Sequence, residues 1–492
     1  MKSLSLKNMP TIFQSTKDMS LAVSREVKAG RLRKIGKSLY TTNLNDDMTQ
    51  VVRQNWLTIV SLLYPGRLLS NRTAYTSGVS SAGIVYVEGG YRRSITLHGT
   101  TFTQFKGAGV IEGDMPMMDI YMPSVARMLL MNLTPSRVRE DESKNVSREE
   151  IETRLMSILN AEGEAGLNRL RDRVMAIAAY VQLEREAGIL NEIIGAILGT
   201  RNSDLDSPTA RAYSAGSPYD QDAVQRIERL WQSLNVTPPK LHQSSAPEGH
   251  AFYVCAFFDA YFSNYIEGTH FEVGEAKQII DSGILPVNRP ADAHDILGTY
   301  RVVGSIENMR RTPGSVEELL NLLKERHSNI MGGRPEKRPG EFKESVNFAG
   351  STRFVSPKMV NGTIAQGFEF YRSLTSPVAK ALLLMFLVAE VHPFDDGNGR
   401  LARVMMNAEL VSAKQSRMII PSVFRNEYIS SLKRLTNHSQ PESFIRVMTF
   451  AHEFVSRISF ESYDDARDQL QRANAFEDPA DEKKLLLPLE RS

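Results

Sequence analysis

The stretch SPVAKALLLMFLVAEVHPFDDGNGRLARVMMNAELVSA, residues 376–413, decides the fold of the C-terminal half of the chain. Residues 376–391 are apolar almost all round, as in a helix that lies inside a helical bundle. Pro393 ends this helix, because the residue before a proline is driven out of the α region. A glycine-rich turn then leads into a second helix, residues 400–413. The sequence therefore predicts two buried helices joined by a short loop that carries His392.

The loop between these helices has groups suited to binding phosphate. A glycine turn that enters a helix N-terminus presents backbone N–H groups to an anion. Arg400 and Arg403 share one face of the first turn, where the helix dipole disfavours cations, so we expect an anion between them. Asp396 beside an anion site favours a divalent metal that bridges it to phosphate.

His392 is the expected proton acceptor of this site. It lies at the C-terminus of the first helix, where the dipole favours imidazolium and makes the neutral ring a better base. The combination of a phosphate cradle and one base suits transfer of a phosphate-containing group to a hydroxyl.

Other motifs of this kind do not fit the stretch. No Gly-Lys-Ser/Thr follows, as a P-loop requires, and neither aspartate opens a loop with the ligand spacing of an EF-hand. GNGRLA imitates a dinucleotide-binding turn, but a helix, a proline and two acids precede it in place of a strand. A plain helix junction with a core histidine would not explain why these groups occur together.

The segment HPFDDGNGRLAR, residues 392–403, resembles the signature H-x-F-x-(D/E)-G-N-(G/K)-R-x-x-R of Fic domains at every specified position. Most Fic enzymes transfer AMP from Mg-ATP to a Ser, Thr or Tyr hydroxyl of a target protein. The resemblance implies that His392 is the general base, that Phe394 anchors the loop and that Asp396 holds the metal. It also implies a phosphate cradle made of Gly397, Asn398 and Gly399, with Arg400 and Arg403 on the outer phosphates.

Residues 332–357 form an irregular, basic stretch around two strand-like pieces, SVNF and TRFV. From the residues alone this is either a hairpin over a site or a long surface loop. The resemblance implies a flap at about residues 340–356 that pairs with the target backbone and aligns its hydroxyl.

Many Fic proteins also have an inhibitory helix with the pattern (S/T)-x-x-x-E-(G/N), whose glutamate pairs with the second arginine. SSAPEG, residues 244–249, matches but contains a proline inside a polar loop. SNYIEG, residues 263–268, matches at the end of an aromatic helix, where a glutamate opposes the dipole. We therefore expect Ser263 and Glu267 to be regulatory, with Arg403 as the partner of the glutamate. The alternative is a core helix with a solvated end residue.

The first 45 residues are strongly basic, with nine Lys or Arg against two acids. A helix that ends at Gly30 precedes the basic strand-turn-strand RLRKIGKSLYT, with Gly36 at the turn. These features resemble the recognition helix and wing of a winged helix and the N-terminal region of AbiEi-type antitoxins of bacterial abortive-infection systems. The resemblance implies DNA phosphate contacts by Arg25, Lys28, Arg31, Arg33, Lys34 and Lys37. The alternative is a solvated basic face or a protein-docking module.

The predicted fold is multidomain, with a mixed α/β N-terminal half that begins with a winged helix. An all-α Fic domain with a β-hairpin flap fills the C-terminal half. Strand-like pieces lie between about residues 80 and 122, in GIVYVEG, RSITLHGTTFTQF and DIYM. The predicted domains are a winged helix (1–65), an AbiEi-antitoxin-like α/β region (66–200), linker and loops (201–249), a Fic domain with its inhibitory helix (250–472) and a tail (473–492).

Bulk properties place few limits on function. The net charge of the 492 residues is only +2, so the overall charge indicates no class of binding partner, and only local clusters of charge can do so. The single cysteine, Cys255, fits a reducing cytosol, and the N-terminus lacks the apolar run of a signal peptide, so we expect a cytoplasmic protein without membrane contact.

A second hypothesis assigns the same motif to a different class of protein. The chain would be a DNA-binding transcriptional regulator or antitoxin-like protein that uses the Fic domain as a nucleotide sensor. The presence of His392 favours the transferase hypothesis, because a protein that only senses nucleotides would not need a catalytic base. The resemblance also implies that Glu267 could orient a water that removes AMP. The implied partners are a target protein, DNA and, as a further alternative, a second copy of the chain in a homodimer.

Overall fold

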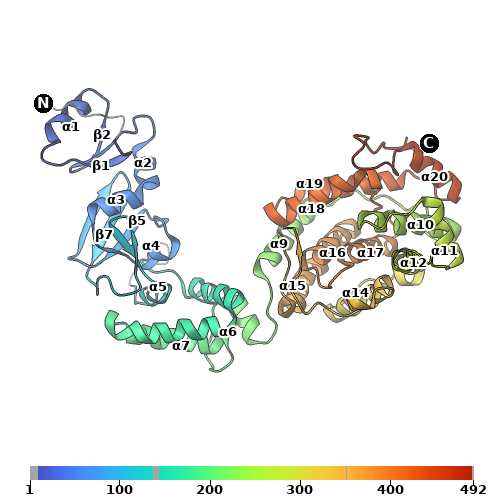
Figure 1. Ribbon diagram of the computed structural model, residues 1–492, viewed down its shortest axis with the longest axis horizontal. Helices are drawn as coiled ribbons and strands as arrows, with labels where there is room; N and C mark the ends of the chain where they lie inside the picture. Colours follow the sequence, from blue (N-terminus) through green and yellow to red (C-terminus); the bar gives the residue numbers. More distant parts are fainter. Residues whose placement is uncertain (1–8, 137–142, 351, 490–492) are drawn as a thin grey trace. The chain divides into compact units, whose positions relative to one another are not determined.

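The computed structural model describes residues 9–136, 143–350 and 352–489. The chain forms two compact units, Met1–Gly216 and Ser217–Ser492 (Figure 1). The division falls inside the predicted linker and loops, residues 201–249, where Gly, Ser, Asp and Pro residues interrupt helical periodicity. Each unit buries its own hydrophobic core.

The first unit begins with a helix and a hairpin near the predicted positions. Its first elements are β1 (Ile12–Gln14), α1 (Ser20–Lys28), β2 (Arg33–Gly36) and β3 (Leu39–Thr41), with sheet order β1-β3-β2. Gly36, which we predicted at the turn, ends β2, and Ser38 has a left-handed backbone, with φ 60°. A helix-turn-helix places two helices before its wing. Residues 9–41 hold one, so the second helix of the predicted winged helix is not found there.

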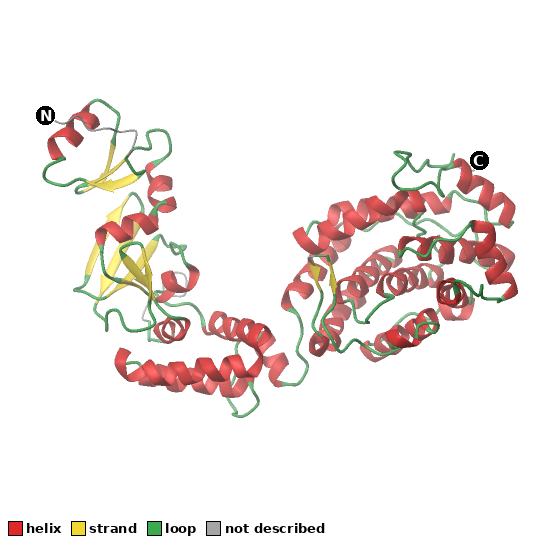
Figure 2. Cartoon of the chain, viewed as in Figure 1, coloured by secondary structure: helices red, strands yellow, loops and turns green. Residues whose placement is uncertain are grey.

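A second sheet follows where the sequence predicted strands. It contains β4 (Leu68–Leu69), β5 (Ile84–Glu88), β6 (Arg93–Leu97), β7 (Thr100–Phe105), β8 (Met115–Met117) and β9 (Ile120–Met122). The strand order is β6-β7-β5-β4-β9-β8, with β5 parallel to β7. Figure 2 draws the strands in yellow. Alternate residues of β7 are buried, and the strand lies in the β-branched and aromatic stretch that predicted it. The prediction missed only the very short β4 and β8.

One core joins the parts of the first unit that we predicted as separate domains. The helices are α2 (Met48–Gln54), α3 (Trp56–Leu63), α4 (Asn71–Thr76), α5 (Val125–Asn132), α6 (Arg148–Val181), α7 (Glu184–Ile197) and α8 (Pro208–Ser214). The buried cluster includes Ile12 of β1, Val52 of α2, Val85 of β5 and Ala210 of α8. The predicted division at residue 65 is therefore wrong, because α2 and α3 bury their apolar faces together with both sheets.

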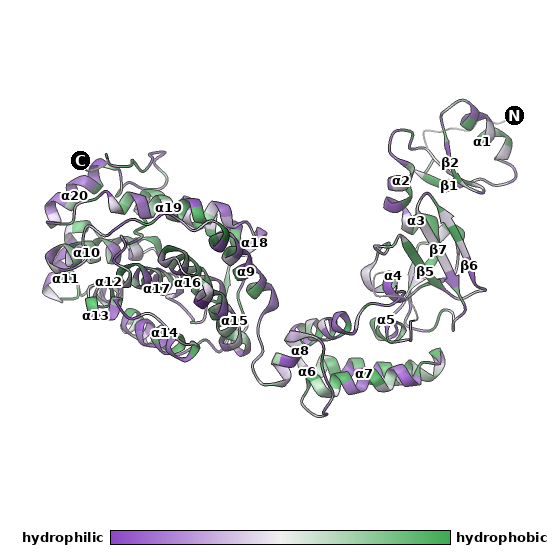
Figure 3. Cartoon of the chain, turned by 180° about the vertical axis from the view of Figure 1, so that it is seen from behind, coloured by the Kyte–Doolittle hydropathy of each residue, from purple (hydrophilic) through white to green (hydrophobic). Residues whose placement is uncertain are grey.

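The second unit is built mainly of helices. They are α9 (Gln221–Val236), α10 (Gly249–Ile266), α11 (Val273–Ser282), α12 (Pro290–Val303), α13 (Ile306–Met309), α14 (Val316–Met331), α15 (Val360–Ser373), α16 (Pro377–Val391), α17 (Asn398–Ser412), α18 (Arg425–His438), α19 (Pro441–Ser456) and α20 (Tyr463–Arg472). The strongly hydrophobic α16 lies among the other helices and packs against α17, as predicted (Figure 3).

The predicted linker at residues 201–249 is wrong, because it contains α8 and α9. Ala223, Ile227, Leu230 and Leu234 of α9 are fully buried and belong to the core of the second unit. These residues recur at helical spacing, but the turn residues on both sides of them obscured the pattern. The second unit therefore starts at Ser217, well before the predicted residue 250.

A short antiparallel hairpin, β10 (Phe348–Ala349) and β11 (Thr352–Arg353), lies within the predicted flap region. Its turn includes residue 351, which lies outside the described residues. Within the described part of the chain, every helix is too short or too polar to traverse a bilayer.

Replacing Leu230 with Ala should destabilise the second unit. Because Leu230 is fully buried in the shared core, we expect the free energy of unfolding to fall by about 2–5 kcal/mol. Urea unfolding measures this change through the fluorescence of Trp231 in α9, in a Trp56→Phe background that removes the other tryptophan. Val236→Ala is the control, since Val236 is 82 % exposed at the end of α9. Equal stability of the two variants would mean that α9 is a linker after all.

Candidate active site

The loop between α16 and α17 creates a site for an anion. His392 ends α16 in the left-handed conformation, with φ 51°, and Gly397 precedes α17 with φ 73°. The first hydrogen bond of α17 runs from the Leu401 N–H to the Gly397 carbonyl. The N–H groups of residues 398–400 therefore have no partner within the helix, and they point toward the space in front of it.

His392 is held as a neutral base. Its Nδ1 lies 3.3 Å from the Ala389 carbonyl oxygen, which can only accept, so Nδ1 has the proton and Nε2 has a free lone pair. Phe354 stacks on the ring at a centroid distance of 3.8 Å. Burial lowers the pKa of His392 to about 4, so the helix dipole that we expected to favour imidazolium is outweighed. At neutral pH the residue is therefore ready to accept a proton.

Phe394 anchors the loop, in agreement with its predicted position in the core. It is fully buried and stacks on His327 of α14 at 3.7 Å. His327 Nδ1 accepts the Gly340 N–H, so its Nε2–H donates to the Asp396 carbonyl oxygen at 3.0 Å. The sequence analysis missed His327, because nothing near it in the sequence indicates that it meets the loop.

The side chain of Asn398 has a different role from the predicted one. Its Oδ1 accepts the Phe394 N–H at 2.9 Å, and its Nδ2 donates to the Phe394 carbonyl at 2.8 Å. Both groups are thus used to close the loop. Only the backbone N–H of Asn398 remains for the predicted phosphate cradle.

Glu267, at the end of α10, lies against the start of α17. Its Oε1 is 2.7 Å from Nη2 of Arg403, which also donates to the Ser263 carbonyl at 2.8 Å. Arg403 Nε donates to Ser263 Oγ at 3.0 Å. A Cβ added at Gly399 would lie 2.3 Å from Glu267 Oε1, so the carboxylate covers the glycine of the anion site. The structure therefore brings together the predicted Ser263, Glu267 and Arg403.

Arg400 is held by an acid that the sequence analysis missed. Its Nη1 forms an ion pair with Asp295 of α12 at 2.8 Å, and Arg334 binds the same carboxylate at 2.9 Å. Asp295 is only 1 % exposed, which cannot be read from its place in the sequence. Arg400 Nε is buried without a hydrogen-bond partner among the described residues. An unpaired buried donor beside the anion site is consistent with a ligand that binds there.

A second buried acid fixes α10 to α17. Asp259 accepts hydrogen bonds from Asn407 Nδ2 at 3.1 Å and from Arg417 at 2.9 Å. Arg417 also donates to the Val303 carbonyl of α12. This network lies two turns before Glu267 on the same helix, so it sets where the end of α10 meets Arg403.

Asp396 fits the predicted metal site. Its Oδ1 accepts the Gly397 N–H at 2.7 Å, and its other oxygen has no partner among the described residues. Mg²⁺ is commonly held by one or two carboxylates together with substrate phosphates and water. One carboxylate beside an anion site therefore matches the needs of Mg²⁺, although the described residues hold no cluster of three or more His, Cys, Asp or Glu that could bind a metal by itself.

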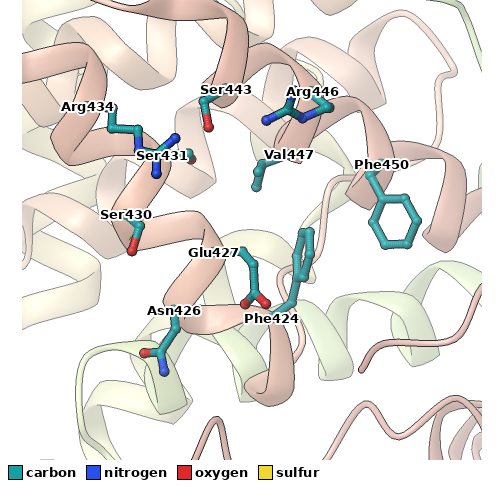
Figure 4. Close-up of a pocket in the computed structure, with 10 residues that line it drawn as sticks. All are labelled: Phe424, Asn426, Glu427, Ser430, Ser431, Arg434, Ser443, Arg446, Val447 and Phe450. Atoms are coloured by element: carbon teal, nitrogen blue, oxygen red, sulfur yellow. The ribbon is translucent and has the colours of Figure 1, made fainter. Parts of the chain in front are cut away.

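The groove between α18 and α19 is a separate feature of the same unit (Figure 4). It has a volume of about 550 Å³, and Arg434, Arg446 and Phe424 are among the residues that line it. None of the lining residues belongs to the loop, to the start of α17 or to the end of α10. The groove is therefore not part of the site at the loop.

The predicted DNA-binding residues lie on α1, on the β2-β3 hairpin and, for Arg31, on the turn between them. Lys28, Lys34 and Lys37 are exposed and have no ion pair among the described residues. Arg31 pairs with Glu26 at 2.6 Å, and Arg33 donates to the Asp46 carbonyl. Arg25 is exposed as well. The lysines are thus freer to meet a phosphate backbone than Arg31 and Arg33.

Comparison with known proteins shows what this part of the chain is similar to. Residues 318–410 match the sequence model of the Fic/DOC family, from α14 to α17. The chain is 28 % identical over 252 residues to a Drosophila yakuba protein named Protein adenylyltransferase Fic, covering 49 % of this chain and 50 % of that protein. It is 23 % identical over 195 residues to Protein adenylyltransferase fic-1 of Caenorhabditis briggsae, covering 39 % and 38 %.

The chain spans about half the length of the Drosophila relatives that it matches. A solved structure of a Fic-1 segment from C. elegans is similar with a TM-score of 0.36 and 17 % identity, over 66 % of this chain and 88 % of that one.

Acidification from pH 7 to pH 5 should lower the free energy of unfolding of the second unit. Burial lowers the pKa of His392 and His327 to about 4 and that of His452 to about 3. Unfolded histidine titrates near ~6.5, so the unfolded chain binds more protons between these values, and stability is lost as the pH falls from about 6.5 toward 4. Urea unfolding at several pH values, followed by Trp231 fluorescence, measures the loss.

The matched variants for this measurement are His452→Leu and His250→Asn. His452 is fully buried, whereas His250 is exposed. We expect a smaller pH dependence in His452→Leu and an unchanged one in His250→Asn. Equal pH dependence in all three proteins would contradict the explanation by buried neutral histidines.

Proposed function

We propose that this chain, whose residues 318–410 match the Fic/DOC family model, transfers AMP from Mg-ATP to a Ser, Thr or Tyr hydroxyl of a target protein, and to itself. The observation that supports the proposal most directly is the pairing of a neutral His392 with an anion site at the start of α17. A base and a phosphate cradle on one rigid loop are what hydroxyl attack on a nucleotide requires.

In the proposed reaction, His392 Nε2 takes the proton of the target hydroxyl as its oxygen attacks the α-phosphorus. A new phosphorus–oxygen bond forms, and the bond from the α-phosphorus to the bridging oxygen breaks, so that pyrophosphate leaves. The free N–H groups of residues 398–400 and the two arginines, Arg400 and Arg403, would hold the phosphates. Asp396 would hold Mg²⁺, which neutralises phosphate charge when bound. The β10-β11 hairpin would align the target backbone.

The pairing of Glu267 with Arg403 supports autoinhibition within the chain. The carboxylate occupies the arginine and covers Gly399, both of which a nucleotide phosphate would need. Two anions in this space would repel each other, so ATP would bind productively only after Glu267 moves away. The side chain of Glu267 is 32 % exposed, so it can swing outward without unfolding α10.

Binding of DNA by the first unit is a second candidate function. It is favoured by the exposed Lys28, Lys34 and Lys37 on a helix and an adjacent hairpin. The chain would then be either a transferase with a DNA-binding module or a regulator that senses nucleotides through its Fic domain. Removal of AMP by a water that Glu267 orients is a further alternative for the same site.

Replacing Glu267 with Gly should raise incorporation of AMP at least about tenfold, because a charge-assisted hydrogen bond of roughly 1.5–3 kcal/mol no longer competes with ATP. Adding His392→Ala should abolish incorporation, since it removes the base. The measurement is the transfer of label from α-labelled ATP with Mg²⁺ into the purified chain, and into proteins of a cell lysate.

Glu272→Gly is the matched control, because Glu272 precedes α11 at a position that tolerates glycine and contacts neither arginine. This variant should label no more than wild type. Equal labelling of wild type and Glu267→Gly would contradict the proposed autoinhibition by Glu267. If no variant is labelled and no lysate protein is labelled, the transfer reaction itself is refuted.

The triple variant Lys28→Ala, Lys34→Ala and Lys37→Ala should weaken binding to duplex DNA and flatten its salt dependence. Each phosphate contact contributes about one unit to the slope of log affinity against log salt, so we expect a decrease of up to about three. Fluorescence anisotropy of a labelled duplex at several salt concentrations measures the slope. Lys433→Ala, an exposed lysine of the second unit, should leave the slope unchanged. Wild-type protein that shows no salt-dependent binding would contradict the DNA proposal.

A further inference from the structure

One segment, residues 343–354, holds the backbone on both sides of His392. The Lys343 N–H donates to the Pro393 carbonyl at 2.9 Å, and Lys343 Nζ donates to the Val391 carbonyl at 3.3 Å. Asn347 Nδ2 donates to the Phe394 carbonyl at 2.8 Å. The carbonyl groups before and after the base are therefore fixed by the segment that leads into the β10-β11 hairpin.

The buried ammonium group of Lys343 joins the segment to the loop. Lys343 is only 3 % exposed, and its Nζ also donates to Asn347 Oδ1 at 2.7 Å. The ammonium thus links the start of the segment to the loop and to the residue just before β10. A buried cation with such partners is costly to displace, which makes the segment a firm support for the loop.

Phe354 is placed on the base by the same hairpin. It follows β11 directly, and its N–H donates to the Asn347 carbonyl at 3.2 Å, so closure of the hairpin sets the position of the ring. The phenyl and imidazole rings are 3.8 Å apart and inclined by only 8°. One face of His392 is therefore covered by a side chain whose location depends on the hairpin.

We propose that Phe354 is a positioning residue for His392. The Nδ1–H bond to Ala389 fixes one edge of the imidazole, and the stacked phenyl ring fixes its plane, so that Nε2 stays in the direction of the incoming hydroxyl. The inference rests on the proposed transfer reaction, because a fixed Nε2 matters only if His392 acts as a base. It goes beyond that reaction, since it assigns a role to a residue outside the loop.

The stack also controls the proton affinity of the base. The charged groups that face His392 are Lys343, which disfavours imidazolium, and Glu267 and Asp396, which favour it. These contributions oppose one another, so exclusion of water is left as the main cause that keeps the ring neutral. Loss of the phenyl ring would admit water to one face and make protonation of His392 easier.

This arrangement links the base to the target. In the proposed function the hairpin aligns the target hydroxyl, and the same hairpin sets the ring that orients Nε2. Both partners of the proton transfer are therefore placed relative to one element, and small errors in its position affect both together. A displacement of about 1 Å can cost roughly a hundredfold in rate. Positioning the hydroxyl and the base by the same hairpin keeps the distance between them constant.

The first test follows His392 directly by NMR titration of full-length protein with labelled histidine. His392→Ala identifies its signal among the nine histidines. Phe354→Ala should raise the apparent pKa of His392 toward its ordinary value, whereas Phe354→Tyr, which keeps the stack, should leave it near that of wild type. Phe354→Leu fills part of the space without an aromatic face, so it should raise the pKa less than Phe354→Ala does, and it covers the case that the alanine variant fails to fold.

The second test measures self-labelling kinetics in the Glu267→Gly background. Phe354→Ala should lower kcat roughly tenfold, a part of the 10²–10⁴-fold that a positioned base contributes, and should leave the KM for ATP within about twofold. The acid limb of its pH profile should move to higher pH, and Phe354→Tyr should restore both. Phe450→Ala is the control, because it removes a half-buried phenylalanine whose ring packs at a tilt against Phe424, away from the loop.

An unchanged pKa of His392 together with an unchanged kcat in Phe354→Ala would overturn the inference. So would an equal loss of kcat in Phe450→Ala. If Glu267→Gly labels nothing, the proposed transfer fails, while the titration still decides whether Phe354 sets the proton affinity of His392. The two failures are thus distinguishable.

Discussion

A buried guanidinium at the start of α17 imposes a constraint on the whole C-terminal unit. Arg403 is only 3 % exposed, and the helix terminus beside it already has a partial positive charge, so an anionic partner is needed. Glu267 and the Ser263 carbonyl supply the partners from the last turn of α10. The end of α10 is therefore fixed against the start of α17, and Asp259 secures the same helix two turns earlier through Asn407 and Arg417.

The other arginine of the site follows the same rule. Arg400 is paired with Asp295, whose carboxylate is shared with Arg334. Each cation near the anion site thus has a carboxylate from a different helix, and an anionic ligand must compete with both. The two carboxylates differ in one respect, because Asp295 is almost completely buried while Glu267 is 32 % exposed. Glu267 is therefore the partner that can leave at lower cost, as the proposed autoinhibition requires.

Two stacked pairs of rings complete the loop, and both depend on neutral histidines. His327 supports Phe394 from one side, and Phe354 covers His392 from the other. Burial lowers the pKa of both histidines to about 4, so neither ring is charged at neutral pH. His327 uses its two nitrogens to join the Gly340 N–H to the Asp396 carbonyl. The loop is thereby connected to the segment before the hairpin, and its shape does not depend on the loop residues alone.

The sequence by itself determined the features that depend on neighbours along the chain. The apolar run, Pro393 and the glycine turn predicted two helices and a loop, and the β-branched and aromatic residues located β5, β6 and β7, because local backbone preferences act within a few residues. Tertiary structure decided the rest: the burial of Asp295, the stack of Phe354 on His392 and the use of the Asn398 side chain to close the loop. It also reversed the expected effect on the proton affinity of His392, since desolvation arises only when segments distant in sequence pack around the ring.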